Sequence, residues 1–262
     1  PYADYAVGSE ETEPSLGWAY SAFLSLLVYD PSISTAELAT NIVESYIDQD
    51  ERITDENARM EFLKQNSSAG GFFGPSRVSA EQIVSQLEKN ITLTPVDLNA
   101  FPDLISAYND FSFAMQDIDQ GVIASARNYA QSYTSIFGNQ VPPSFIDLGH
   151  FVQLVAKQTN DSKVRNAAND VLTSLQNVIV AERHGKSKPG STGIAIYFPN
   201  STLYRSPYTG MQSYTAIADR FARVSLWDDF LVYHYNNRAF DVDAAEPVVP
   251  SSSGITRAPG SG

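Results

Sequence analysis

Segments with helical periodicity far outnumber strand-like segments in this chain of 262 residues. Only three short runs have the pattern of strands: Tyr5–Gly8, Ile91–Val96 and the continuous apolar stretch Gly193–Pro199. The last run gives the strongest signal, and an unbroken apolar run is typical of a central strand. Helices that alternate with strands indicate an α/β layered fold. Because three strands make a small sheet for such a fold, we expect further strands from sequence upstream of Pro1.

Polar caps and apolar stripes predict where the helices begin. Ser34 and Glu37 form a capping box for a helix over residues 34–47. Asp97 and Asp147 are expected to cap helices that carry the apolar residues of 98–111 and 151–155, and Asn160–Asp161 to start a helix with the apolar residues of 164–178. Further helices are predicted over residues 15–29, 121–135, 214–221 and 225–235.

One large domain over residues 1–241 is the expected organisation. Between about residues 48 and 90 the helical pattern weakens, and glycine pairs and charged residues indicate an insertion that leaves the core. Residues 242–262 are rich in Pro, Ser and Gly, which is typical of a linker or stalk. The strand pattern follows Pro1 at once, so we expect that the sequence starts inside a domain, after processing or trimming.

The charge balance excludes several classes of partner. The formal net charge is −13 and the isoelectric point is near 4.5. Nucleic acids and anionic lipids need clustered Lys and Arg, so neither is an expected partner. The chain also lacks a run of about 18 apolar residues, so no transmembrane segment is expected.

Four glycosylation sequons suggest where the protein is located. They begin at Asn66, Asn90, Asn160 and Asn200. With the acidic composition and the polar tail, they favour a secreted or cell-surface glycoprotein, although the same residues also suit ordinary polar loops. The absence of cysteine leaves the redox compartment undetermined.

Five short motifs resemble the clostripain-like cysteine peptidases, in the order in which that family has them. They are Ala3–Tyr5 with Gly17–Trp18 and Tyr20, Thr94–Leu98, Ser144–Leu148 with Phe151, Gly193–Pro199, and Phe221–Leu231. The resemblance implies a caspase-like (caspase/haemoglobinase) three-layer sandwich, incomplete here without upstream strands. It also implies a Cys–His dyad, with both members upstream of residue 1.

Dyad chemistry needs a thiolate beside an imidazolium and backbone donors for the oxyanion. The chain has no cysteine to provide that thiolate. We therefore assign no catalytic residue, and we expect His150, His184 and His234 to be structural or solvent-exposed. No metal ligands are assigned either. Calcium is implied only by the resemblance, and the acidic stretch Asp48–Glu56 suits a solvated face better than an ion site.

The resemblance implies a substrate-binding wall formed by Ser9, Glu10, Glu11, Leu16 and Trp18. The carboxylates lie after a strand, where active-site loops of such sheets gather. Alternatively, they cap the next helix and hold the loop in place. Family members that cleave after Arg or Lys tend to carry an acidic residue at the position of Leu16, so specificity for a basic side chain is in doubt.

Three interpretations follow. The first is part of a secreted cysteine endopeptidase that acts on peptides, in which an upstream chain bearing Cys and His supplies the dyad. The second is a non-catalytic, glycosylated cell-surface or structural protein that keeps a peptidase-like fold for binding. The third is a regulatory half that caps another peptidase. Whether the chain acts as an enzyme stays open at this point.

Overall fold

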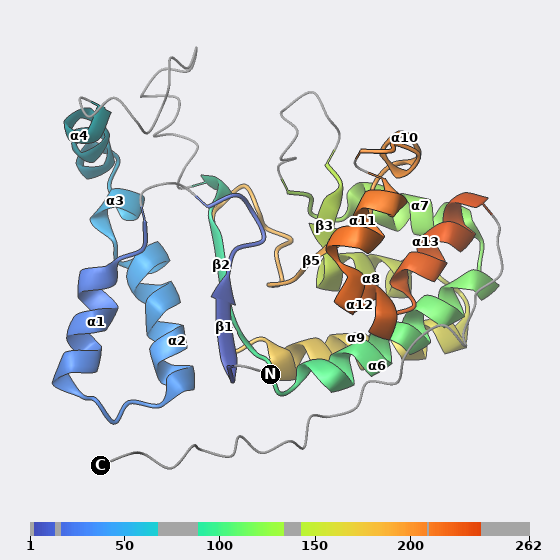
Figure 1. The fold of residues 1–262 in the computed structure, drawn as a ribbon, viewed down its shortest axis with the longest axis horizontal. Helices are drawn as coiled ribbons and strands as arrows, with labels where there is room; N and C mark the ends of the chain where they lie inside the picture. Colours follow the sequence, from blue (N-terminus) through green and yellow to red (C-terminus); the bar gives the residue numbers. More distant parts are fainter. Residues whose placement is uncertain (1–2, 14–16, 68–88, 134–142, 209, 237–262) are drawn as a thin grey trace.

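The computed structural model describes residues 3–13, 17–67, 89–133, 143–208 and 210–236 (Figure 1). The strands are β1 (Tyr5–Gly8), β2 (Thr92–Asp97), β3 (Phe145–Asp147), β4 (Arg183–His184) and β5 (Ala195–Tyr197). The helices of the first half are α1 (Tyr20–Tyr29), α2 (Thr35–Val43), α3 (Glu51–Thr54), α4 (Glu56–Ser67), α6 (Phe101–Ala114) and α7 (Gln120–Tyr129). The remaining helices are α8 (Leu148–Gln158), α9 (Ser162–Val178), α10 (Ser201–Tyr204), α11 (Met211–Ile217), α12 (Asp219–Val224) and α13 (Trp227–Asn236). None of these helices is long and apolar enough to cross a membrane.

The chain forms three layers, with a small sheet between two groups of helices (Figure 1). The sheet has the order β1-β2-β4, and both pairings are antiparallel. Helices α1–α4 lie on one side, and α6, α8 and α9 lie on the other (Figure 1). Within the described residues β1 pairs only with β2, so its second edge keeps unpaired backbone groups. The predicted mixed helix–sheet class is confirmed.

Strand β2 lies between the two hydrophobic cores and contributes side chains to both. Ile91 and Leu93 pack with Val43 and Tyr46 in the smaller core, beneath α2. Val96 packs against the larger core on the opposite side. Because successive side chains of a strand point to opposite faces, one strand supplies both cores.

The larger core gathers around α9 and the aromatic residues of α13. Helix α9 buries Val164, Ala168, Val171 and Leu175, the spacing of a single helical face. Trp227 is fully buried, and its indole Nε1 donates to the carbonyl of Tyr197 at 2.7 Å. Burying each large apolar side chain contributes about 1.5–3 kcal/mol, so this core is the main source of stability.

Several predicted starts are confirmed by cap geometry. Ser34 accepts from the Glu37 amide at 3.2 Å, Asp147 from the His150 amide at 2.6 Å, and Asp161 from the Val164 amide at 3.0 Å. Strands β1 and β2 also lie where the sequence predicted them.

Two predicted helix starts are wrong. Asp97 is not an N-cap, because α6 begins at Phe101 and the Asp97 carboxylate instead accepts from the Asn99 amide at 2.8 Å in the preceding turn. Pro102 follows at the start of α6, a position that suits proline. Helix α1 begins at Tyr20, five residues after the predicted start at Ser15.

The strand predicted over Gly193–Pro199 is confirmed only in part, because it is shorter than predicted and is not central. Only Ala195–Tyr197 are a strand, and within the described residues they pair with β3 alone, in register Phe145↔Tyr197 and Asp147↔Ala195. Gly193 has φ of +108° and its Cα lies close to the Thr94 side chain, so the chain bends before the strand. The apolar run is buried by helices, a case that periodicity alone does not distinguish from burial between strands. The predicted tail, residues 242–262, lies outside the described residues.

Candidate functional site

The loop that follows β1 is fixed by the hydroxyl of one threonine. Thr92, at the start of β2, accepts from the amides of Glu10 and Glu11 at 3.0 Å each. Its hydroxyl also lies 2.9 Å from the hydroxyl of Ser9, and that of Ser9 is 2.7 Å from the Glu11 carbonyl. Thr92 is buried. Three consecutive residues after the strand are therefore held against the neighbouring strand rather than free to move.

Glu11 points into the protein and forms a buried ion pair with Lys188. Both residues are 7% exposed, and the Lys188 Nζ also donates to the Ser132 carbonyl at 3.1 Å. The other carboxylate oxygen of Glu11 accepts from the Thr12 amide at 2.9 Å. Removing one member of such a pair leaves an uncompensated buried charge. Glu11 therefore connects the β1 loop to the loop over residues 185–193.

Asp147 is the centre of a second buried network. It is fully buried and accepts from the His150 amide at 2.6 Å, the Thr192 amide at 2.6 Å and the Thr192 hydroxyl at 2.7 Å. The Tyr133 hydroxyl lies 3.1 Å away and also contacts Ser191 at 2.9 Å. These donors and the N-terminus of α8 stabilise the carboxylate.

Glu10 lies between these networks. Both of its carboxyl oxygens are buried, and neither makes a hydrogen bond of good geometry within the described residues, although the side chains of Asp147 and Tyr133 lie beside it. Burial, and then the charge of Asp147, raise the pKa of Glu10 to about 9. The carboxyl therefore carries a proton at neutral pH. We call these residues the polar cluster: Glu10, Glu11, Tyr133, Asp147, Lys188, Ser191 and Thr192.

Trp18 belongs to a different group of residues. Its indole Nε1 donates to Glu13 at 3.1 Å, and the carbonyls of Gly17 and Trp18 accept from Arg52 Nη2 at 3.3 Å each. Arg52 is itself paired with Asp50 at 2.5 Å. Trp18, Asp50 and Arg52 line an open hollow of about 560 Å³. Arg52 thus fixes the backbone beside the hollow.

The five predicted substrate residues therefore divide. Ser9, Glu10 and Glu11 come together at the polar cluster, and Trp18 lines the separate hollow. Leu16 lies outside the described residues. Glu11 holds the loop, as the alternative expects, but no side chain caps α1. A substrate contact stays a prediction.

Each histidine has a partner within the described residues. His150 Nδ1 accepts from the Gln131 amide at 3.1 Å, and His184 Nδ1 lies 2.9 Å from a Glu182 oxygen. His234 stacks on Phe230 and lies edge-on to Phe198, with Nδ1 2.8 Å from the Gln120 side chain, and burial lowers its pKa to about 4. These are structural contacts, as the sequence led us to expect.

The acidic stretch makes caps and ion pairs. Asp48 pairs with Arg183 at 2.9 Å, Asp50 caps α3, and the Asp55 carboxylate accepts from the amides of Asn57 and Ala58. Among the described residues, no three metal-ligating side chains come together.

Sequence reasoning missed Lys188, Tyr133 and Arg52. Lys188 stands in a loop of Gly, Lys, Ser and Pro, a composition that predicts solvent exposure, and its partner lies 177 positions away. Asp147 was recognised only as a helix cap, although its second oxygen carries the network. No local signal distinguishes these residues from ordinary loop positions.

The sequons differ in accessibility. Asn160 is exposed just before the cap of α9, while Asn90 is half-buried. Asn200 accepts from the Leu203 amide at 2.8 Å and so caps α10. Asn66 lies within α4.

Comparison with known proteins now gives one clear match. The model of the clostripain family matches residues 1–234, which confirms the resemblance of the motifs. Two solved structures are similar. A B. fragilis cysteine protease has 11% identity, a TM-score of 0.47, and coverage of 88% of this chain and 78% of its own. A secreted C11 cysteine protease from Bacteroides thetaiotaomicron, bound to an irreversible peptide inhibitor, has 14% identity, a TM-score of 0.47, and coverage of 84% and 52%. No curated protein matches the sequence.

Proposed function

Because the chain belongs to the clostripain family of cysteine peptidases, we propose that it is the downstream part of a secreted endopeptidase with a caspase-like fold. In this proposal it supports the sheet and forms one wall of the substrate cleft. The Cys and His of the dyad come from an upstream segment, since this chain has no cysteine.

The observation that carries the proposal is the fixed loop at the end of β1. Two sets of contacts hold Ser9–Glu11: the hydrogen bonds of the Glu10 and Glu11 amides to the Thr92 hydroxyl, and the ion pair of Glu11 with Lys188. Substrate-binding loops gain from such rigidity because less entropy is lost when the substrate binds. The unpaired edge of β1 within the described residues suits an additional strand, on which the nucleophile would precede this loop.

The chemistry follows from the dyad. The thiolate attacks the scissile carbonyl to give a thioester, and the leaving amine takes a proton from the imidazolium. Water then hydrolyses the thioester and regenerates the thiol. In this scheme the chain positions the substrate and supports the sheet, and it supplies no reacting group.

We further propose that the substrate residue at the cleaved bond is not basic. Leu16 provides no carboxylate, Glu11 is already paired with Lys188, and Asp50 with Arg52. An arginine or lysine head group held there without a partner would be destabilised.

The test uses the native protein from its source. N-terminal sequencing and intact mass identify any companion polypeptide, and a peptidyl chloromethyl ketone labels an active thiol. We expect labelling of a cysteine upstream of Tyr2, competed by peptide substrates with an apolar residue before the scissile bond. A chain with neither a companion nor an upstream reactive cysteine would instead establish the non-catalytic surface protein.

Extracellular location is part of the same proposal. If the protein is secreted through a glycosylating pathway, the exposed Asn160 is the first expected site of modification. Mass spectrometry of native material after deglycosylation in ¹⁸O water would find a labelled aspartate at position 160. Unmodified Asn160 in material from such a pathway would argue against the glycoprotein assignment.

A further inference from the structure

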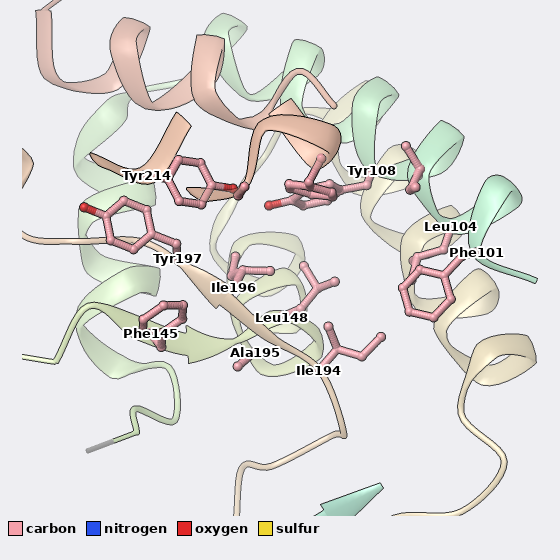
Figure 2. Close-up of a pocket in the computed structure, with 13 residues that line it drawn as sticks. Phe101, Leu104, Tyr108, Phe145, Leu148, Ile194, Ala195, Ile196, Tyr197 and Tyr214 are labelled. Atoms are coloured by element: carbon pink, nitrogen blue, oxygen red, sulfur yellow. The ribbon is translucent and has the colours of Figure 1, made fainter. Parts of the chain in front are cut away.

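An apolar cavity of about 280 Å³ lies between α6, the β3–β5 ribbon and helices α11 and α12 (Figure 2). All 13 of its lining residues are aliphatic or aromatic. Six of them are aromatic: Phe101, Tyr108, Phe145, Tyr197, Tyr214 and Phe221. Pockets with such walls bind small apolar molecules.

One polar group in the wall of this cavity makes no hydrogen bond within the described residues. Tyr108 is 2% exposed, and its hydroxyl has no hydrogen-bond partner among the described residues. Its ring is held by Trp227 at 5.3 Å and Phe221 at 6.4 Å between ring centroids. In Figure 2 the hydroxyls of Tyr108 and Tyr214 point toward one another from their two helices. A buried hydroxyl without a partner is unfavourable, so a ligand that satisfies it gains affinity.

The electrostatics of the cavity select for a neutral ligand. Burial raises the pKa of Tyr108 well above its ordinary value, and burial with the nearby Asp228 carboxylate raises the pKa of Tyr214. Both hydroxyls therefore keep their protons and can donate or accept. The lining contains no Lys, Arg, His, Asp or Glu, so a charged ligand would lose its hydration without gaining a partner.

The dimensions limit the apolar part of the ligand to about one ring. An engineered apolar cavity of about 150 Å³ is enough to hold benzene. A cavity of 280 Å³ therefore suits a single ring with short substituents.

From these observations we propose that this cavity binds a small, neutral, single-ring aromatic compound that carries one hydroxyl or carbonyl group, with that group hydrogen-bonded to Tyr108. The cavity is formed entirely by residues 101–221 of this chain. The proposal therefore stands independently of the upstream dyad and of peptidase activity.

The test compares three probes of similar size on the full chain: 4-methylphenol, toluene and 4-methylbenzoate. Binding is measured by ligand-observed NMR titration. We expect 4-methylphenol to bind about 3- to 10-fold more tightly than toluene, the factor that one hydrogen bond supplies. The charged benzoate is expected to show no binding.

Two variants assign the binding to this cavity. Tyr108→Phe removes the hydroxyl and keeps the ring, so the preference for 4-methylphenol over toluene should disappear while toluene affinity is kept. Tyr208→Phe is the matched control, because that tyrosine is 85% exposed, and it should change nothing. Ala218→Leu places a larger side chain in the wall and should weaken both neutral probes by at least about 10-fold, with circular dichroism confirming that the variant is folded.

Each contrary result would overturn the proposal. Absence of binding by both neutral probes would mean that the cavity is closed in solution, for example by the chain's own side chains. A preference that survives Tyr108→Phe would place the hydrogen bond elsewhere. Unchanged binding in a folded Ala218→Leu protein would place the ligand outside this cavity.

Discussion

The two helical layers on either side of the sheet bury their apolar residues to very different extents. Helix α9 places its whole apolar face in the larger core. Helix α1 buries only Phe23 and leaves Leu24, Val28 and Tyr29 exposed by 46%, 81% and 89%. The smaller core beneath α2 holds six buried residues. The difference indicates that the layer of α6–α13 is stable by its own packing, while the layer of α1–α4 depends more on its contacts with β1 and β2.

The polar cluster connects the loop after β1 to the layer of α6–α13. The layer of α1–α4 depends on β1, so we expect the loss of this connection to lower the free energy of unfolding more than any other change. Lys188→Met removes the buried positive charge that is paired with Glu11, and we expect a loss of about 3–5 kcal/mol in the free energy of unfolding. Urea denaturation measures this. Lys163→Met, at an exposed position at the start of α9, is the control and should change stability by less than about 0.5 kcal/mol.

The double variant Glu11→Leu/Lys188→Met separates charge from packing. Replacing both partners of a buried ion pair with apolar residues is often neutral, so most of the loss should be recovered. If the double variant is as unstable as Lys188→Met alone, the lysine acts through its contact with the Ser132 carbonyl instead.

Matched Val→Ala substitutions, one in each hydrophobic core, sharpen the comparison of the two cores. Val43 and Val171 are both fully buried, in α2 and α9 respectively. Replacing either with Ala should cost about 1–3 kcal/mol. We expect Val171→Ala to lower global stability, and Val43→Ala to accelerate hydrogen exchange in α2 while α9 amides remain protected. Equal acceleration in both helices for Val43→Ala would show that the layers unfold as one unit.

Glu10 predicts a dependence of stability on pH. Its pKa is raised from 4.5 to about 9 in the folded protein, so between these values the folded state binds more protons than the unfolded state. Stability should therefore fall as pH rises through this range, because burial, and then the charges of Asp147 and Glu182, disfavour ionised Glu10 in the folded protein. The other charged or titratable members of the polar cluster are the Lys188–Glu11 pair and Tyr133.

The variant Glu10→Gln tests this assignment. It should be more stable than the unmodified chain by on the order of 2 kcal/mol at pH 8.5, with the difference shrinking toward pH 5. Glu56→Gln, at an exposed position, should leave the pH profile unchanged. A constant difference at all pH values would mean that Glu10 does not titrate in this range.

Local signals predicted the fold well wherever the decisive contact is local. Ser34, Asp147 and Asp161 cap helices through amides two or three residues away, so their pattern alone was sufficient. The prediction that Asp97 caps a helix was wrong because a turn lies between Asp97 and the start of α6. The strand at Gly193–Pro199 was predicted too long and as a central strand because burial by helices and burial by strands leave the same pattern.

The candidate site was less predictable, for a physical reason. The loop Ser9–Glu11 was identified, but its fixing partners Thr92 and Lys188 lie 81 and 177 positions away. A single sequence carries no sign of such pairings. The raised pKa of Glu10 likewise depends on burial by segments that meet only in the folded chain.

The helix caps provide the smallest effect and the most direct comparison of the two layers. Ser34→Ala and Asp161→Ala each remove a side-chain acceptor from the first turn, of α2 and α9 respectively, at a local cost of about 1 kcal/mol. Since α9 is integral to the larger core, we expect the full cost of Asp161→Ala to appear in global unfolding. For Ser34→Ala we expect much of it to appear only as fraying of α2 in hydrogen exchange. Identical losses in global stability would mean that the layer of α1–α4 is as firmly coupled to the fold as α9, and the contrast between the layers would then be one of exposure alone.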